Sequence, residues 1–238
     1  MIDRQERRNA LNAELCEAIR YELREHPDLR ALVITGAGSA FCSGADLVTR
    51  FDDGDGADTF RPAFERALDD IVAYPAPVIA AINGPAMGAG MQLAVACDLR
   101  VAALGARLAI PGGRLGIHLS SRNIWRLASL VGHANARDFL LAGRTVNAEE
   151  ALHLGLVQRC SEDAVADALS IAGEIAAFAP LTVQGHKRAL NLVAEQLWLN
   201  KRARDEIDRL EARAFASADL REGMAAFAEK RNPNFRGE

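Results

Sequence analysis

The chain has 238 residues, of which 50% are apolar and 25% are charged, and its formal net charge is −4. A chain of this length buries enough apolar surface to fold without disulfides or a structural metal, and its charge balance excludes the basic footprint of a nucleic-acid-binding protein. Aromatic residues are scarce, at 5%, whereas glycine occurs 19 times, so the composition favours close backbone packing over a broad aromatic pocket.

Helical and strand patterns alternate along the first two thirds of the chain. In chain order they predict a helix over 9–25, a strand over 31–35, a helix over 59–74, a buried strand over 77–82, a helix over 88–97 and a strand over 99–102. The strand signal fades after residue 157, and from about residue 171 onward the sequence reads as helix. This pattern is typical of an α/β fold. We expect an α/β core over 1–180, followed by a helical region over 181–238.

Some patterns resemble known sites but lack their spacing. Gly36 and Gly38 follow a strand as in a dinucleotide fingerprint, but Phe41 stands where the third glycine belongs. The acidic loop over 52–58 lacks the ligand spacing of an EF-hand. The sequence has no G-x-S-x-G elbow and no metal-type pairing of its histidines or cysteines, so we expect no metal site. The cysteines are interpreted as buried free thiols, namely Cys16, Cys42, Cys97 and Cys160.

The sequence predicts a cytoplasmic protein without a membrane span. Its first ten residues are too charged for a signal peptide. The uncharged run over 75–97 is long enough to span a bilayer, but Asn83-Gly84-Pro85 interrupts it, so it reads as a buried strand, a turn and a buried helix.

Two glycine-bearing turns follow the first two strand units. Ser43-Gly44-Ala45-Asp46-Leu47 comes after the first, and the run over 84–93 comes after the second and opens a helix. Helix N-termini offer unpaired N–H groups at a positive dipole end, so two such turns facing each other could form an oxyanion hole. Tight packing of strands on helices through small residues explains the same pattern equally well.

The chain resembles the crotonase (enoyl-CoA hydratase/isomerase) family over nearly its whole length. The matching segments are Asn9-Ala10-Leu11-Asn12, Phe41-Cys42-Ser43-Gly44-Ala45-Asp46-Leu47, Ile82-Asn83-Gly84-Pro85-Ala86, Cys97-Asp98-Leu99-Arg100, Gly155-Leu156-Val157 and the tail from Arg221 to Arg231. The resemblance implies a spiral of ββα turns and a C-terminal helical region that builds homotrimers, usually paired into hexamers. It also implies a CoA thioester as the ligand, with no other cofactor. The family has an initial strand before Ile2, and this chain begins at what would be that strand's end.

The resemblance assigns roles to residues of this chain. The backbone N–H groups of Ala45 and Ala89 match the oxyanion donors, while Gln92 and Gly112 occupy the positions of two catalytic glutamates. The matched substrate contacts are Arg8, Asn9, Ala10, Leu11, Ser43, Gly44, Asp46, Leu47, Gly88, Phe227 and Lys230. Arginines near the two ends of the chain could meet the CoA phosphates, a role equally open to a solvated basic face: Arg4, Arg7, Arg8 and Arg231, with Lys230. Actinobacterial members that resemble this chain include proteins with glutamine in the oxyanion helix, and only three of its 28 basic residues are lysines, as in proteins from GC-rich genomes.

The replaced glutamates decide the predicted function. Hydration of an enoyl thioester needs one group to activate water and another to protonate carbon, each worth about 10²–10⁴-fold. Gln92 does not titrate near neutral pH, Gly112 has no side chain, and no Asp or Glu lies between Gly112 and Ile124. We therefore predict an acyl-CoA-binding protein of fatty-acid metabolism with little or no hydratase activity. Two alternatives stay open, another thioester-enolate reaction using His118, Ser120 or Arg114, and an active hydratase with an unusual catalytic residue.

Overall fold

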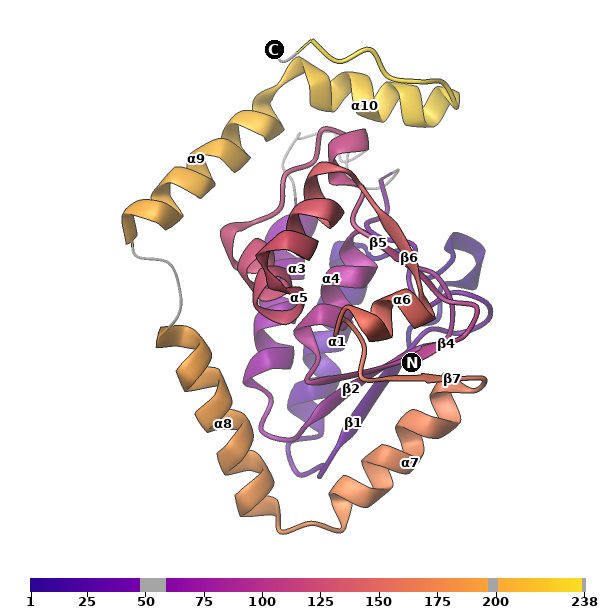
Figure 1. The fold of residues 1–238 in the computed structure, drawn as a ribbon, viewed down its shortest axis with the longest axis vertical. Helices are drawn as coiled ribbons and strands as arrows, with labels where there is room; N and C mark the ends of the chain where they lie inside the picture. The colour runs from indigo at the N-terminus through magenta and orange to yellow at the C-terminus, as the bar shows by residue number, and fades with distance from the viewer. Residues whose placement is uncertain (48–58, 197–200, 237–238) are drawn as a thin grey trace. The chain divides into compact units, whose positions relative to one another are not determined.

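The computed structural model describes residues 1–47, 59–196 and 201–236. The acidic loop predicted over 52–58 lies outside these residues. The course of the chain can be followed in Figure 1. Its contacts divide it into two compact units, unit 1 with residues 1–108 and 146–196 and unit 2 with residues 109–145 and 197–238. The predicted boundary after residue 180 concerns which helices build an oligomer, and it stays a prediction.

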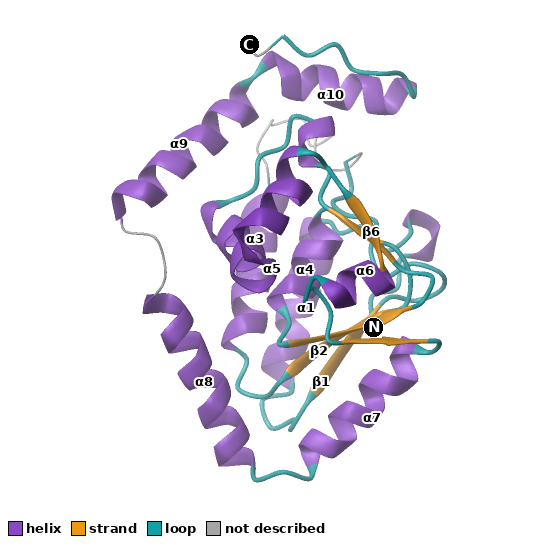
Figure 2. Cartoon of the chain, viewed as in Figure 1, coloured by secondary structure: helices purple, strands orange, loops and turns teal. Residues whose placement is uncertain are grey.

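Helices and strands alternate through unit 1 (Figure 2), as the sequence predicts for an α/β fold. Its elements are η1 (Gln5–Arg7), α1 (Ala13–Glu25), β1 (Leu32–Thr35), α3 (Phe60–Ala73), β2 (Val78–Ile82), β3 (Ala86–Met87), α4 (Ala89–Ala96), β4 (Leu99–Ala103), β5 (Arg107–Ala109), β6 (Thr145–Asn147), α6 (Ala148–His153), β7 (Arg159–Ser161), α7 (Ala164–Ala176) and α8 (Pro180–Gln196), with β5 and β6 crossing the boundary to unit 2. Unit 2 contains η2 (Gly112–Arg114), α5 (Ser121–Leu141), α9 (Lys201–Ala216) and α10 (Ala218–Glu229).

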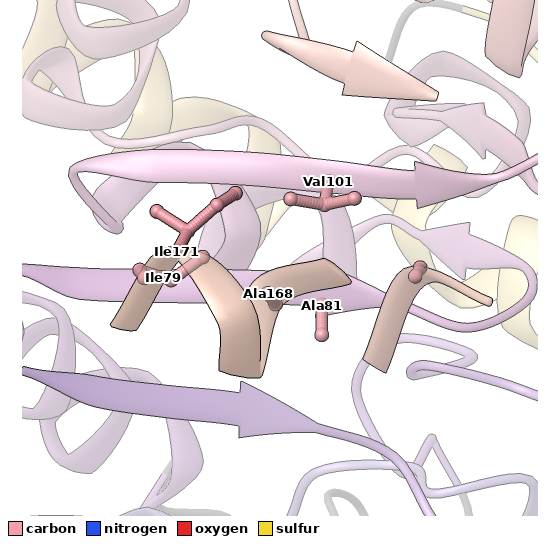
Figure 3. Close-up of a cluster of buried hydrophobic side chains, with 6 residues drawn as sticks. Ile79, Ala81, Val101, Ala168 and Ile171 are labelled. Atoms are coloured by element: carbon pink, nitrogen blue, oxygen red, sulfur yellow. The ribbon is translucent and has the colours of Figure 1, made fainter. Parts of the chain in front are cut away.

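A parallel sheet in the order β1-β2-β4-β7 forms the centre of unit 1. All five residues of β2 are buried, which explains its unbroken apolar sequence. Helix α7 covers one face, where Ala168 and Ile171 pack on Ile79, Ala81 and Val101 (Figure 3). The small side chains of Ala81 and Ala168 allow the helix to approach the strands closely.

The predicted helix over 9–25 is wrong at its start, because α1 begins at Ala13. Asn9 has a left-handed backbone with φ +59°, and Leu11 pairs with Ala45 instead of joining the helix. Asn12 ends this segment as the N-cap, and its side chain accepts the Leu15 N–H at 2.9 Å. The fading strand signal after residue 157 also misses β7, a three-residue edge strand with little buried surface.

Helix α8 is anchored on unit 1 by a buried lysine. The Lys187 ammonium lies 2.7 Å from an Asp98 carboxylate oxygen and 3.0 Å from the Ala76 carbonyl oxygen, with the Ile71 carbonyl at 3.4 Å. Three acceptors suit the three N–H bonds of an ammonium group, so the buried charge is compensated. Asp98 also accepts the Val78 N–H at 2.7 Å, which links the helix to the start of β2.

Of the described helices, none is by itself long and apolar enough to cross a membrane. Helices α7 and α8 meet the length and composition test together, but the chain bends by 112° between them.

Candidate functional site

The turn after Cys42 is held by a short parallel ladder. Ser43 N–H donates to the Arg8 carbonyl, Leu11 N–H to the Gly44 carbonyl and Asp46 N–H to the Leu11 carbonyl, at 2.7–3.0 Å. In a parallel ladder the residue between two bonded positions directs its N–H to the opposite side. Ala45 is that residue, and among the described residues nothing accepts its N–H.

The second predicted turn leads into α4 through a backbone that only glycine adopts readily. Gly88, the N-cap, has φ +53° and ψ −113°. Gly90 follows in the first turn, and a Cβ atom there would lie 2.4 Å from the Cys42 carbonyl oxygen, so glycine permits the close contact. The Ala89 N–H has no acceptor among the described residues, as expected for the first residue of a helix.

The structure brings these two turns together. Gly44 has φ +112°, and a Cβ atom there would lie 3.1 Å from the Met87 carbonyl oxygen and 3.8 Å from the Ala89 nitrogen. Cys42 pairs with Ala86 in a parallel bridge, which ties the start of one turn to the start of the other. Ala45 and Ala89 therefore lie on turns in contact with each other, and neither N–H has an acceptor among the described residues, as an oxyanion hole requires of its donors.

Cys42 supports this arrangement and supplies no nucleophile. The Gly44 N–H donates to its sulfur at 3.4 Å, and the thiol lies under Gly90. Burial raises the pKa of the Cys42 thiol to about 12, so the thiol is protonated at neutral pH. Among the other cysteines, Cys16 and Cys97 are also buried free thiols, as predicted, whereas Cys160 is half-buried.

The N-terminal segment braces the first turn from behind. The Asn9 side chain is buried, donates to the Ala37 and Ala40 carbonyls and accepts the Arg4 N–H. The Arg4 guanidinium contacts Asp46 at 3.0 Å, so its charge is paired within the protein. The sequence alone does not reveal this ion pair, because 42 positions separate its partners.

The remaining predicted contacts of unit 1 differ in exposure. Arg8 and Ser43 are exposed, Leu47 and Gly88 are half-buried, and the others face inward, namely Ala10, Leu11, Gly44 and Asp46. The Ser43 hydroxyl donates to the Arg7 carbonyl at 3.1 Å. Contact of a ligand with the inward-facing residues would have to use backbone atoms.

Gln92 lies on α4, one turn beyond Gly88. Its N–H closes the first helical turn on the Gly88 carbonyl at 3.1 Å, and its side chain is half-buried. An amide at this position can donate and accept hydrogen bonds but cannot exchange a proton as a carboxylate does.

Gly112 lies in a tight loop of unit 2. Its carbonyl accepts the N–H groups of Leu115 and Ile117, both at 3.0 Å. A Cβ atom at Gly112 would lie 2.5 Å from the Ile117 carbonyl oxygen, closer than real contacts allow. In this conformation the main chain of Ile117 occupies the space that a side chain at position 112 would need.

The other predicted residues of unit 2 are His118, Phe227 and Lys230. The Nδ1 atom of half-buried His118 lies 2.6 Å from the Leu119 carbonyl oxygen, so this ring nitrogen contacts the backbone of the next residue. Phe227 and Lys230 are exposed at the end of α10, where Lys230 closes the helix with φ +54°. Arg231 is committed to ion pairs with Glu222 and Glu229.

Across the described residues, no group of three or more His, Cys, Asp and Glu side chains could hold a metal ion.

Comparison with known proteins identifies the family. A family model described as "Enoyl-CoA hydratase/isomerase" matches residues 1–238. The chain belongs to the enoyl-CoA hydratase/isomerase family. It is 43% identical over 244 residues to "Probable enoyl-CoA hydratase echA6" of Mycobacterium tuberculosis, and the match covers 99% of this chain and 94% of that protein.

Solved structures share the fold of this chain. An enoyl-CoA hydratase/isomerase from Pseudoalteromonas atlantica T6c superposes with a TM-score of 0.86 at 35% identity, covering 98% of this chain and 94% of that one. A methylmalonyl CoA decarboxylase complexed with 2S-carboxypropyl CoA gives a TM-score of 0.90 over 99% of this chain and 92% of that one, at 23% identity. The predicted crotonase-like α/β fold is therefore confirmed.

Proposed function

We propose that this member of the family binds acyl-CoA thioesters and polarises their carbonyl group, with little or no hydration of the double bond. One observation carries the proposal: the turns that hold Ala45 and Ala89 are in contact, and neither N–H has an acceptor among the described residues. The loss of hydration is supported by Gly112, at a catalytic position by resemblance, where the Ile117 carbonyl oxygen would lie 2.5 Å from a Cβ atom.

Binding of the thioester and hydration of its double bond require different chemical groups. Backbone N–H donors bind a thioester oxygen and stabilise negative charge on it, which serves any reaction of the family and also simple binding. Hydration additionally requires groups that transfer protons. Gln92 cannot act as a general acid or base, and position 112 offers no side chain.

Relatives support the ligand class. The family model and the mycobacterial relatives carry names that refer to enoyl-CoA, and the structural neighbour with a TM-score of 0.90 is a complex with 2S-carboxypropyl CoA. The proposed ligand is thus a CoA thioester of fatty-acid metabolism, and the proposed location of the protein is the cytoplasm.

Two measurements on the purified protein test this function. Calorimetric titration with palmitoyl-CoA is expected to show saturable binding, and free CoA is expected to bind more weakly because it has no acyl chain or thioester carbonyl. Crotonyl-CoA and a long-chain enoyl-CoA are expected to show hydration at least about 10²-fold slower than with an authentic hydratase assayed in parallel. Efficient hydration would overturn the proposal that hydratase activity is lost. Absence of acyl-CoA binding would overturn the proposed function itself.

A further inference from the structure

A buried ion pair lies directly behind the Ala45 turn. The Arg4 guanidinium donates to an Asp46 carboxylate oxygen at 3.0 Å and to the Ala10 carbonyl at 2.7 Å. Only 4% of the Asp46 side chain and 23% of the Arg4 side chain are exposed. A guanidinium group holds two acceptors in a fixed geometry, so this contact joins the two strands of the ladder at defined positions.

Both contacts fall next to the residues that orient Ala45. Asp46 follows Ala45 in the chain, and Ala10 precedes Leu11, the residue paired with Ala45. Because Leu11 accepts the Asp46 N–H and donates to the Gly44 carbonyl, any shift of Asp46 against Leu11 would rotate the peptide that carries the Ala45 N–H.

The other side of the turn is also fixed. Ser43 donates from its N–H to the Arg8 carbonyl and from its hydroxyl to the Arg7 carbonyl. Arg8 and Asn9 have consecutive left-handed backbones, at φ +50° and +59°, a conformation that side chains disfavour. Such strain persists where surrounding contacts impose it, here through the buried Asn9 amide.

We propose that the Arg4–Asp46 ion pair positions the Ala45 N–H for the thioester oxygen, so that Arg4 and Asp46 are positioning residues of the site. This inference rests on the proposed function. It predicts that weakening the ion pair changes how strongly a bound thioester carbonyl is polarised, beyond any change in protein stability.

The test uses a chromophoric thioester, 4-dimethylaminocinnamoyl-CoA, whose absorption moves to longer wavelength when its carbonyl oxygen accepts stronger hydrogen bonds. Asp46→Asn removes the charge but keeps the shape of the side chain. Arg4→Met removes the hydrogen-bond donors, and Arg4→Lys keeps the charge but loses the planar guanidinium group that holds two acceptors. Asp70→Asn is the matched control, because it weakens an ion pair with Arg20 at 2.7 Å that joins α1 to α3.

For Asp46→Asn and Arg4→Met we expect the red shift of the bound probe to fall by about half or more. The reason is that a rotated Ala45 N–H would make a bent hydrogen bond, and hydrogen bonds weaken steeply when the donor–hydrogen–acceptor angle falls below about 120°. The dissociation constant should rise by no more than about tenfold, the contribution of one hydrogen bond. Arg4→Lys should retain part of the shift. Asp70→Asn should retain all of it, even if its melting temperature falls as far as that of Asp46→Asn.

The outcomes separate the two proposals. A full red shift in Asp46→Asn and Arg4→Met, with or without weaker binding, would overturn the positioning role while leaving the function intact. A loss of shift in Asp70→Asn that matches its loss of stability would also overturn it, because general destabilisation would then explain the effect. No binding of the probe or of palmitoyl-CoA by the unmodified protein would overturn the proposed function, and the inference with it.

Discussion

At position 112 the backbone itself leaves no room for a side chain. If glycine had simply replaced a larger residue, the space of the missing side chain would remain open. Here the Ile117 carbonyl oxygen lies 2.5 Å from the place of a Cβ atom, and the Ile117 N–H is bonded to the Gly112 carbonyl. A double substitution of Gln92→Glu with Gly112→Glu is therefore expected to require a rearranged loop before the new carboxylate at position 112 could take part in hydration.

The simplest prediction from this geometry compares two neighbouring glycines. Gly112→Ala should lower the free energy of unfolding by about 1–3 kcal/mol, because the new methyl group collides with a backbone oxygen. Gly113→Ala should be neutral or stabilising by up to about 1 kcal/mol, since its Cβ would meet nothing within 4 Å and alanine restricts the unfolded chain. Urea denaturation measures both. Equal stability of the two variants would contradict the closed loop.

At the residue scale, the sequence shows which residues stand at the predicted site positions but not what surrounds them. The absence of carboxylates at Gln92 and Gly112 is read directly from the letters, as is the glycine content of the two turns. The Arg4–Asp46 ion pair depends on contact between segments far apart in the sequence. The position of the Ile117 carbonyl next to Gly112 depends on the conformation of the loop between them. Neither leaves a periodic pattern that a single sequence would show.

Among the elements, α10 carries a structured tail. After Lys230 the chain reverses and runs back along the helix (Figure 1). Glu222 receives a two-pronged contact from Arg231, at 2.6 and 2.9 Å, and the Asn234 N–H at 2.7 Å, while Asp219 accepts the Arg236 N–H. The helix therefore fixes the tail through carboxylates on its own surface.

This attachment should depend on pH. The Arg231 hydrogen bonds, followed by the Asn234 N–H, lower the pKa of Glu222 to about 2, against about 4.3 in an unfolded chain. Because the folded pKa is the lower one, the contribution to stability is complete above about pH 4.3 and is lost as the pH falls toward 2. Carboxyl-carbon NMR should place the Glu222 midpoint near 2.

The matched variant is Arg231→Gln, in which the Glu222 midpoint should rise toward about 4.3 and carboxypeptidase should remove the tail faster at neutral pH. A midpoint already near 4.3 in the unmodified protein would refute the attachment.

Element boundaries show where periodicity misleads. Leu11 fits the helical spacing of Leu15 and Ile19, so the apolar pattern placed it on the first helix. In the structure Leu11 is fully buried as the partner of Ala45, and the helix begins only after the Asn12 cap. The same apolar side chain satisfies either environment, and long-range pairing with the glycine turn decides between them.

At the scale of the whole molecule, the family resemblance predicts a homotrimer or hexamer. Helix α8 agrees with this expectation because it exposes large apolar side chains, with Leu190 at 69% and Val193 at 61%. Light scattering should give three or six times the chain mass of 25.6 kDa. Replacing Leu190 and Val193 by Glu should produce smaller species, whereas His186→Glu, on an exposed polar position of α8, should not. A monomer in the unmodified protein would contradict the prediction.

The α/β class and the place of most elements could be predicted for the molecule as a whole, because buried strands and amphipathic helices have distinct periods. The division into two compact units could not, since unit 1 combines residues 1–108 with 146–196. That arrangement depends on contacts such as Lys187 with Asp98, 89 positions apart, which the order of elements does not encode.

The burial of Lys187 also determines how the protein can be labelled. The sequence has only three lysines, and the other two, Lys201 and Lys230, are exposed on α9 and at the end of α10. Amine-reactive dyes and lysine crosslinkers will therefore modify lysines in residues 201–230 while leaving the lysine of the folded core untouched. A fluorophore attached to either of these lysines would report on the C-terminal helices, and labelling of Lys187 would report that α8 has detached.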